Sequence, residues 1–283
     1  MSFRRRIRGR TDWGTIARML KHWLRMSLLC SVPALASAVE CSQIEFRGAH
    51  STICHVDTRT ERLRLFLYDE SGAPFNSFPK LSESLAQRGG KLLFAMNAGM
   101  FRTDYSAVGL LVIGGKQLHR LNLASGYGNF YLKPNGVFVL SASGAQLLES
   151  SEYRSLQEPA MEATQSGPLL VRDGRINSAF NESGTSRLIR NGVGVISPHQ
   201  VVFAISDDPV NFYEFALLFR DRLKCPTALY FDGNVSSLYF AGSGRNDHHV
   251  PLGPIVAISA APQESAVPTQ TKRAPHSSHP DRP

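Results

Sequence analysis

The chain has 283 residues, 42% of them hydrophobic and 19% charged, with a formal net charge of +8. Such a chain can bury a substantial core and can form a single domain. The charge is concentrated in residues 1–38, which hold eight Lys/Arg and one acidic residue, a net of +7. The remainder is therefore close to neutral, at about +1 (8 − 7), and gives no reason to expect nucleic acid or an anionic membrane as a partner.

A targeting segment is predicted at the N-terminus. A basic stretch is followed by an apolar run over residues 26–38, which ends in the small residues Ala36-Ser37-Ala38. This pattern is typical of a secretory signal peptide cleaved near Ala38, so we expect a periplasmic or secreted protein. A single-span anchor is the alternative, but the run is shorter than the roughly 20 residues that a bilayer requires, and we expect no stable membrane span.

Three cysteines follow the predicted signal peptide: Cys41, Cys54 and Cys225. Residues 47–50 could turn a hairpin between the first two, and an exported protein can keep a disulfide. We therefore predict a Cys41–Cys54 disulfide. Cys225 has no histidine near it in sequence and is interpreted as a packed thiol.

Most of the predicted elements are short strands rich in branched and aromatic residues and bounded by Gly, Asn, Asp or Pro. In chain order they are residues 63–68, 92–96, 109–113, 136–140, 166–171, 192–196, 201–205 and 228–231. Helices are predicted at 81–88 and 211–223, and Asn211 with Glu214 fits an N-cap and its partner at the start of the second. Many strands and few helices favour an α+β fold, a single domain over residues 39–261 built on a mixed, largely antiparallel sheet. Residues 262–283 are rich in Pro, Ser, Thr and His, and we expect a disordered tail.

Four glycine-containing segments with polar residues lie at the ends of predicted strands. They are residues 97–101, 165–168, 190–194 and 231–236. Glycine allows close backbone approach to a ligand, and a polar residue at the end of a buried strand is a usual place for chemistry. We expect these four segments to converge on one site.

These segments resemble the motifs of the phosphodiester glycosidase family, and the resemblance covers about residues 41–258. The N-x-G-x-F and G-P-x-L-x-x-D-G patterns of the family are met by Asn97, Gly99 and Phe101, and by Gly167, Pro168, Leu170, Asp173 and Gly174. The R-T-A-I-G pattern is met in part by Arg190, Val193 and Gly194, with Asn191 where threonine is usual. The D-G-G-G-S pattern is met by Asp232, Gly233 and Ser236, whereas Asn234 and Val235 replace two glycines. The chain is more similar to the bacterial branch of the family.

The resemblance implies a hydrolase that cleaves the bond between a sugar anomeric carbon and a phosphodiester oxygen, and the predicted signal peptide implies that it is exported. Its expected partner is a small-molecule or polysaccharide sugar phosphodiester. The candidate catalytic residues are Asp232, to activate water or stabilise an oxocarbenium-like carbon, Arg190, to hold phosphate as a bidentate fork, and Asp104 as a second carboxylate. The structural alternatives are an Asp-Gly turn, a solvated arginine and a surface turn. Candidate substrate-binding residues are Asn97, Gly99, Gln165, Ser166, Gly167, Arg187, Asn191, Gly233 and Ser236.

Two other functional classes remain open from the sequence. A metal-dependent phosphodiesterase would cut the P–O bond, with a divalent ion held by Asp232, Asp104 and His248 or His249, although Asp247-His248-His249 lacks a recognised metal-site spacing. A non-catalytic envelope glycan-binding protein would keep the pocket without turnover. Ser166 lacks the spacing of a serine-hydrolase nucleophile. No cofactor is firmly implied.

Overall fold

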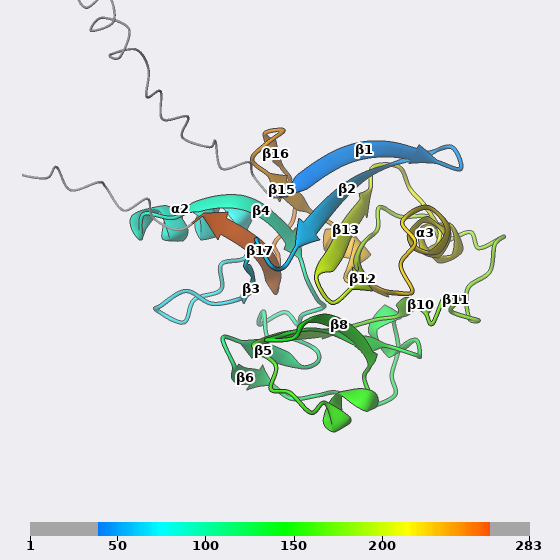
Figure 1. Cartoon of the computed structure of the whole chain (residues 1–283), viewed down its shortest axis with the longest axis horizontal. Coiled ribbons are helices and arrows are strands. Elements are labelled where there is room, and N and C mark those ends of the chain that lie inside the picture. The colour runs from blue at the N-terminus through cyan, green and yellow to red at the C-terminus, as the bar shows by residue number, and fades with distance from the viewer. Residues whose placement is uncertain (1–38, 261–283) are drawn as a thin grey trace, which may run out of the picture. The chain divides into compact units, whose positions relative to one another are not determined.

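The computed structural model describes residues 39–260 (Figure 1). The predicted signal peptide and the predicted tail lie outside the described residues. The first elements are a hairpin of β1 (Glu40–Phe46) and β2 (Ala49–Asp57), whose turn residues Arg47 and Gly48 take φ of 54° and 80°. Cys41 lies opposite Cys54 in this hairpin, and the two form the predicted disulfide. Cys225 is free and buried, and burial raises the pKa of its thiol to about 12, as expected for a packed thiol.

The strands form three sheets, and every pairing among the described strands is antiparallel. The seven-stranded sheet has the order β1, β2, β13 (Gln200–Ser206), β12 (Asn191–Ser197), β14 (Thr227–Tyr230), β10 (Leu169–Arg172) and β11 (Arg175–Ile176). One five-stranded sheet has the order β16 (Arg245–Asn246), β15 (Leu238–Phe240), β4 (Lys91–Asn97), β17 (Ile255–Ala260) and β3 (Leu63–Phe66). The other has the order β6 (Lys116–His119), β5 (Leu111–Ile113), β9 (Glu162–Ser166), β7 (Gly136–Ser141) and β8 (Gly144–Glu149). The α+β class is confirmed, but the strands are divided among three sheets instead of sharing one mixed sheet.

The largest core cluster lies where residues of all three sheets meet. Phe203 of β13 packs against Phe94 of β4 and Phe138 of β7, with ring centroids 5.1 and 6.2 Å apart. Alternate side chains of a strand point to opposite faces. Val201, Phe203 and Ile205 therefore enter this central core, whereas Val202 and Ala204 of the same strand pack in the cluster that contains α3. Because both faces of β13 are covered, its sequence is a continuous apolar run instead of an alternating one.

Two helices cover outer faces of the sheets. The first, α2 (Phe78–Gln87), begins after the N-cap Ser77 and packs through Phe78 and Leu81 against the sheet of β4. The second, α3 (Phe212–Leu217), has the predicted capping box, in which Asn211 and Glu214 each bond the backbone N–H of the other. It continues as a turn of π-helix, η3 (Leu218–Arg222), so the predicted helix over 211–223 is present with a change of winding. None of the helices within residues 39–260 is long and apolar enough to cross a membrane.

One predicted strand is divided in two. The apolar run over residues 166–171 is broken at Gly167–Pro168, where the peptide bond is cis. β9 ends at Ser166 in one sheet and β10 begins at Leu169 in another. This break carries the chain from one sheet to the next beside the candidate site.

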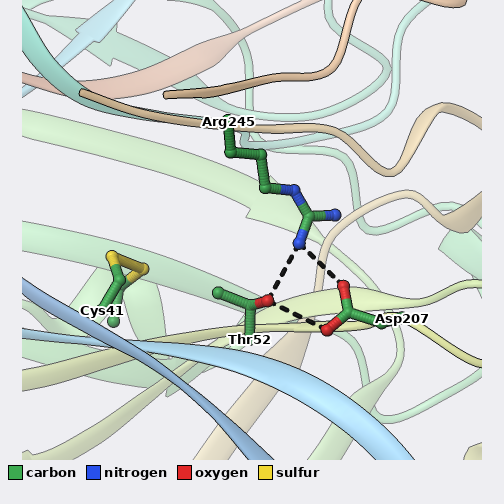
Figure 2. Close-up of a disulfide and its surroundings, with 5 residues drawn as sticks. Cys41, Thr52, Asp207 and Arg245 are labelled. Atoms are coloured by element: carbon green, nitrogen blue, oxygen red, sulfur yellow. Dashed lines mark hydrogen bonds and ion pairs between the residues drawn. A yellow bond between two sulfur atoms is a disulfide. The ribbon is translucent and has the colours of Figure 1, made fainter. Parts of the chain in front are cut away.

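A network of charged and polar side chains connects the disulfide-bonded hairpin to the β15–β16 hairpin (Figure 2). Arg245 Nη1 donates hydrogen bonds to Asp207 Oδ1 at 2.7 Å and Thr52 Oγ1 at 2.9 Å, and Thr52 Oγ1 donates to Asp207 Oδ2 at 2.9 Å. The other side of the guanidinium pairs with Asp247, whose Oδ2 accepts from the N–H of Leu238 at 3.0 Å. The network therefore fixes the start of β15, directly after the 231–236 segment.

Candidate active site

Asn97 ends β4 and is completely buried. Its Oδ1 accepts hydrogen bonds from Asn191 Nδ2 and from the N–H of Ser237, both at 2.9 Å. Its Nδ2 donates to the carbonyl oxygen of Asp232 at 3.1 Å. The amide thus holds the loop that follows β14 and does not reach the surface in this conformation.

Asn191 begins β12 and completes this arrangement from the other sheet. Its Oδ1 accepts from the N–H of Asp232 at 3.3 Å and from Ser236 Oγ at 3.2 Å, while Nδ2 donates to the carbonyl oxygen of Asn97 at 3.0 Å. A threonine hydroxyl has a single proton and could not make all of these bonds. Asparagine in place of the usual threonine at position 191 therefore forms a buried amide pair with Asn97, and this pair joins two sheets to the Asp232 loop.

Asp232 leaves β14 as the N-cap of a 3-10 turn, η4 (Gly233–Val235), and its Oδ1 accepts from the N–H of Asn234 at 3.1 Å. Its side chain is partly buried. Burial raises the pKa of the carboxyl group to about 6, and the hydrogen bond from Asn234 opposes this rise. A carboxyl group that titrates near 6 can accept a proton at neutral pH and give it up again, which is what a general base or acid requires.

The replacements at Asn234 and Val235 are accommodated by the form of this turn. Neither residue is among the described residues with positive φ, so the turn does not need glycine there. Gly233 is needed for another reason, because a Cβ on it would overlap the hydroxyl of Tyr230.

The second motif segment meets the same loop. Ser166 Oγ is buried and donates to the carbonyl oxygen of Phe231 at 2.6 Å. A Cβ on Gly167 would lie 2.6 Å from that of Asn135, and one on Gly99 would lie 2.8 Å from Thr164 Oγ1. The four segments expected to converge are thus in contact, and their glycines permit close packing between the strands.

Gln165 is also buried, and its amide is fully used inside the protein. Oε1 accepts from the N–H groups of Leu110 and Asn122, and Nε2 donates to the carbonyl oxygen of Asn122 and to Ser150 Oγ. This side chain anchors the loop after β6 beside the site and leaves no polar atom for a ligand.

Arg190 differs from the exposed phosphate clamp expected from the sequence. Its side chain is completely buried, with Nε donating to the carbonyl oxygen of Val210 and Nη2 to that of Ser186, both at 2.9 Å. The guanidinium lies over the ring of Phe212 at 3.7 Å. Because the guanidinium is buried against Phe212 and two of its nitrogens bond carbonyl oxygens, it does not face a ligand in this conformation.

Two predicted site residues lie in surface structure. Arg187 forms a half-exposed ion pair with Glu214 at 2.8 Å. Asp104 is exposed and accepts from the N–H and the hydroxyl of Ser106, and these bonds lower the pKa of its carboxyl group. Across the part of the chain that the structure describes, no hydrogen bond or ion pair joins either residue to the Asp232 loop.

The residues named for a metal site are not gathered in one place. His248 and His249 stack on each other, and Asp247 pairs with Arg245. Within residues 39–260, no group of three or more His, Cys, Asp or Glu side chains is placed to hold a metal ion.

Sequence reasoning missed Tyr230, Phe212 and Ser237, which contact the predicted residues. Tyr230 is 1% exposed, and its hydroxyl accepts from the N–H of Gly233. The signal was weak, because a tyrosine in an apolar strand is ordinary. Its position two residues before Asp232 could have indicated it.

Comparison with known proteins gives a consistent set of relatives. The family model for phosphodiester glycosidases matches residues 90–268. The uncharacterized protein YigE of Escherichia coli (strain K12) is 31% identical over 203 residues, which is 72% of this chain and 79% of that protein. Among solved structures, the catalytic domain of zebrafish N-acetylglucosamine-1-phosphodiester alpha-N-acetylglucosaminidase, auto-inhibited by its pro-peptide, aligns with a TM-score of 0.54. The alignment has 15% identity and covers 80% of this chain and 84% of that one, which shows a shared fold.

Proposed function

The chain belongs to the phosphodiester glycosidase family, and from this premise we propose that it is an exported hydrolase of glycosyl phosphodiesters. The bond cleaved is the one between the anomeric carbon of a sugar and the phosphodiester oxygen. One observation carries the proposal: Asp232, with a pKa raised to about 6, lies where the four motif segments meet.

The proposed reaction uses water and one carboxylate. The carboxylate of Asp232 accepts a proton from water, the water oxygen forms a bond to the anomeric carbon, and the electrons of the C1–O bond leave with the phosphate oxygen. An ordinary glycosidase needs a second carboxylic acid to protonate a poor alkoxide leaving group. Here the leaving group is a phosphate monoester, whose second pKa is near 6, so it can depart as an anion. A site with one perturbed carboxylate is therefore sufficient for this leaving group.

Two features support export. The Cys41–Cys54 disulfide fits an oxidising compartment. The proposed signal peptide precedes Val39, which is buried in the central core. Cleavage near Ala38 would thus keep every residue that the structure describes in the mature chain.

The test is to incubate the exported protein with a panel of sugar-1-phosphodiesters and to identify both products by mass spectrometry. We expect a free sugar and a phosphate monoester, and a fall in kcat of about 100-fold or more for Asp232→Asn, the usual size of a lost acid–base group. Asp69→Asn is the matched control, because Asp69 is a partly exposed carboxylate that accepts hydrogen bonds from Ser71, two residues later. Normal turnover by Asp232→Asn would refute this role.

Asp104→Asn in the same assay tests the second candidate carboxylate. Its exposed turn predicts turnover close to that of the wild type. Activity lost to chelator and restored by a divalent ion would instead support the metal-dependent phosphodiesterase.

A further inference from the structure

Arg190 carries a buried charge that is only partly satisfied. Two of its nitrogens bond the carbonyl oxygens of Val210 and Ser186, and Nη1 is the one buried side-chain nitrogen or oxygen of residues 39–260 without a hydrogen-bond partner. Burying a cation and leaving a donor unpaired both cost free energy. Such an arrangement calls for a role beyond packing.

Tyr230 connects this charge to the Asp232 loop. Its ring lies 5.6 Å from the guanidinium carbon and meets Phe212 edge-on, with centroids 4.8 Å apart. Burial raises the pKa of the Tyr230 hydroxyl, and the nearby guanidinium opposes this rise. The same hydroxyl accepts the N–H of Gly233, the first residue of the turn that Asp232 caps. The side chain of Tyr230 therefore contacts the Asp232 loop through its hydroxyl and lies beside the buried cation through its ring.

We propose that Arg190 and Tyr230 form a buried positioning pair that holds Asp232 in place for catalysis, an inference that rests on the proposed function of Asp232. The positive charge attracts the lone pairs of the phenol oxygen, and this oxygen receives the N–H of Gly233. This hydrogen bond holds the N–H of Gly233 at one side of the turn. The Asp232 side chain holds the other side, because its Oδ1 accepts the N–H of Asn234. Neither Arg190 nor Tyr230 touches substrate in this scheme.

The packing around Gly233 supports this assignment. A Cβ at position 233 would overlap the Tyr230 hydroxyl and lie 3.0 Å from the carbonyl oxygen of Ile189, the residue before Arg190. The turn thus packs directly against Tyr230 and the backbone beside Arg190, and only glycine, which has no Cβ, allows the chain to come so close.

The experiment compares Tyr230→Phe, Arg190→Met and the double variant, with Tyr153→Phe as the control. Tyr153 is a half-buried tyrosine beside the sheet of β5–β9, in a different core cluster. Amide hydrogen exchange at Gly233 and Asn234 is read by NMR without substrate, together with kcat and KM. We expect each single variant to exchange about tenfold faster at Gly233, the equivalent of one hydrogen bond, with β4 amides unchanged. The double variant should be no faster than the faster single one, because both act through the same bond.

In the kinetic assay, kcat should fall about tenfold in both single variants while KM stays within about threefold, because the pair acts on the carboxylate and not on binding. If Arg190→Met does not fold, Arg190→Lys replaces it, since lysine keeps the charge but cannot make both carbonyl bonds, and the same direction is expected. Unchanged exchange at Gly233 in folded variants would overturn the pair. Faster exchange without any wild-type turnover would leave the pair intact and refute only the proposed function.

Discussion

At the scale of one residue, the burial of Asp232 favours its proposed catalytic role but lowers the stability of the fold. Burial raises the pKa of the carboxyl group toward neutral pH, where it can exchange protons, and it does so by disfavouring the charged form. The pKa of this carboxyl group is about 6 in the folded protein, whereas the reference pKa of an aspartate side chain is 3.8. Between these values the folded state binds more protons than the unfolded chain, so stability falls as pH rises from about 4 through 6.

We therefore predict that Asp232→Asn stabilises the protein at pH 7.5. A difference of about two pKa units corresponds to at most about 3 kcal/mol, and the gain should vanish near pH 4. Urea denaturation at the two pH values measures it. Asp69→Asn is the control, because hydrogen bonds from Ser71 lower the pKa of Asp69 and predict the opposite sign. Equal stability of Asp232→Asn and the wild type at both pH values would show that the carboxyl group is solvated.

Gly233 gives a second prediction at this scale. Gly233→Ala should destabilise the fold by about 1–3 kcal/mol, because the new methyl group overlaps the Tyr230 hydroxyl. Adding Tyr230→Phe removes the overlapping oxygen and should recover part of the loss. Thermal denaturation of the two single variants and the double variant measures this. A double variant that is worse than the sum of the two would contradict the placement of the hydroxyl.

At the scale of elements, the site depends on contacts between segments that are far apart in sequence. Asn97 and Asn191 could be predicted as polar residues at strand ends, because the apolar runs and glycines that bound them are visible. Their pairing could not, since they are 94 positions apart and belong to different sheets. Arg190 was expected at the surface, where most arginines lie, because nothing in its own segment shows that Phe212 and the carbonyl oxygens of Ser186 and Val210 surround it.

Three short strands were also missed. β6 and β16 are mostly polar, and β15 has only three residues, so none of them shows an apolar alternation long enough to indicate a strand. The hairpin between Cys41 and Cys54 was predictable because its turn is local.

The network around Arg245 gives the prediction at this scale. Arg245→Met should cost about 3 kcal/mol or more, because Asp207 and Asp247 would be left partly buried without their cation. Arg88→Met is the control, since Arg88 pairs with the exposed Glu70 and should cost less than about 1 kcal/mol. Urea denaturation compares the two. Similar losses would mean that the network contributes no more than a surface ion pair.

At the scale of the whole molecule, the three sheets share one core, and the four motif segments meet where strands of different sheets end or begin. The shared fold thus supplies a rigid frame that holds the four segments together, and the chemistry is carried by the residues at their meeting point.

Export predicts where the mature chain begins. N-terminal sequencing of protein from the native host should give a start near Val39, because Ala36-Ser37-Ala38 presents small side chains to a signal peptidase. An intact basic leader on protein from the cytoplasm would contradict export.

The proposed reaction breaks the C1–O bond and keeps the P–O bond. Hydrolysis in water labelled with oxygen-18, followed by mass spectrometry of both products, tests it most directly, because the new oxygen marks the atom that water attacked. The proposed role of Asp232 predicts label on the sugar and none on the phosphate monoester. Label on the phosphate would contradict the glycosidase assignment and establish a phosphodiesterase.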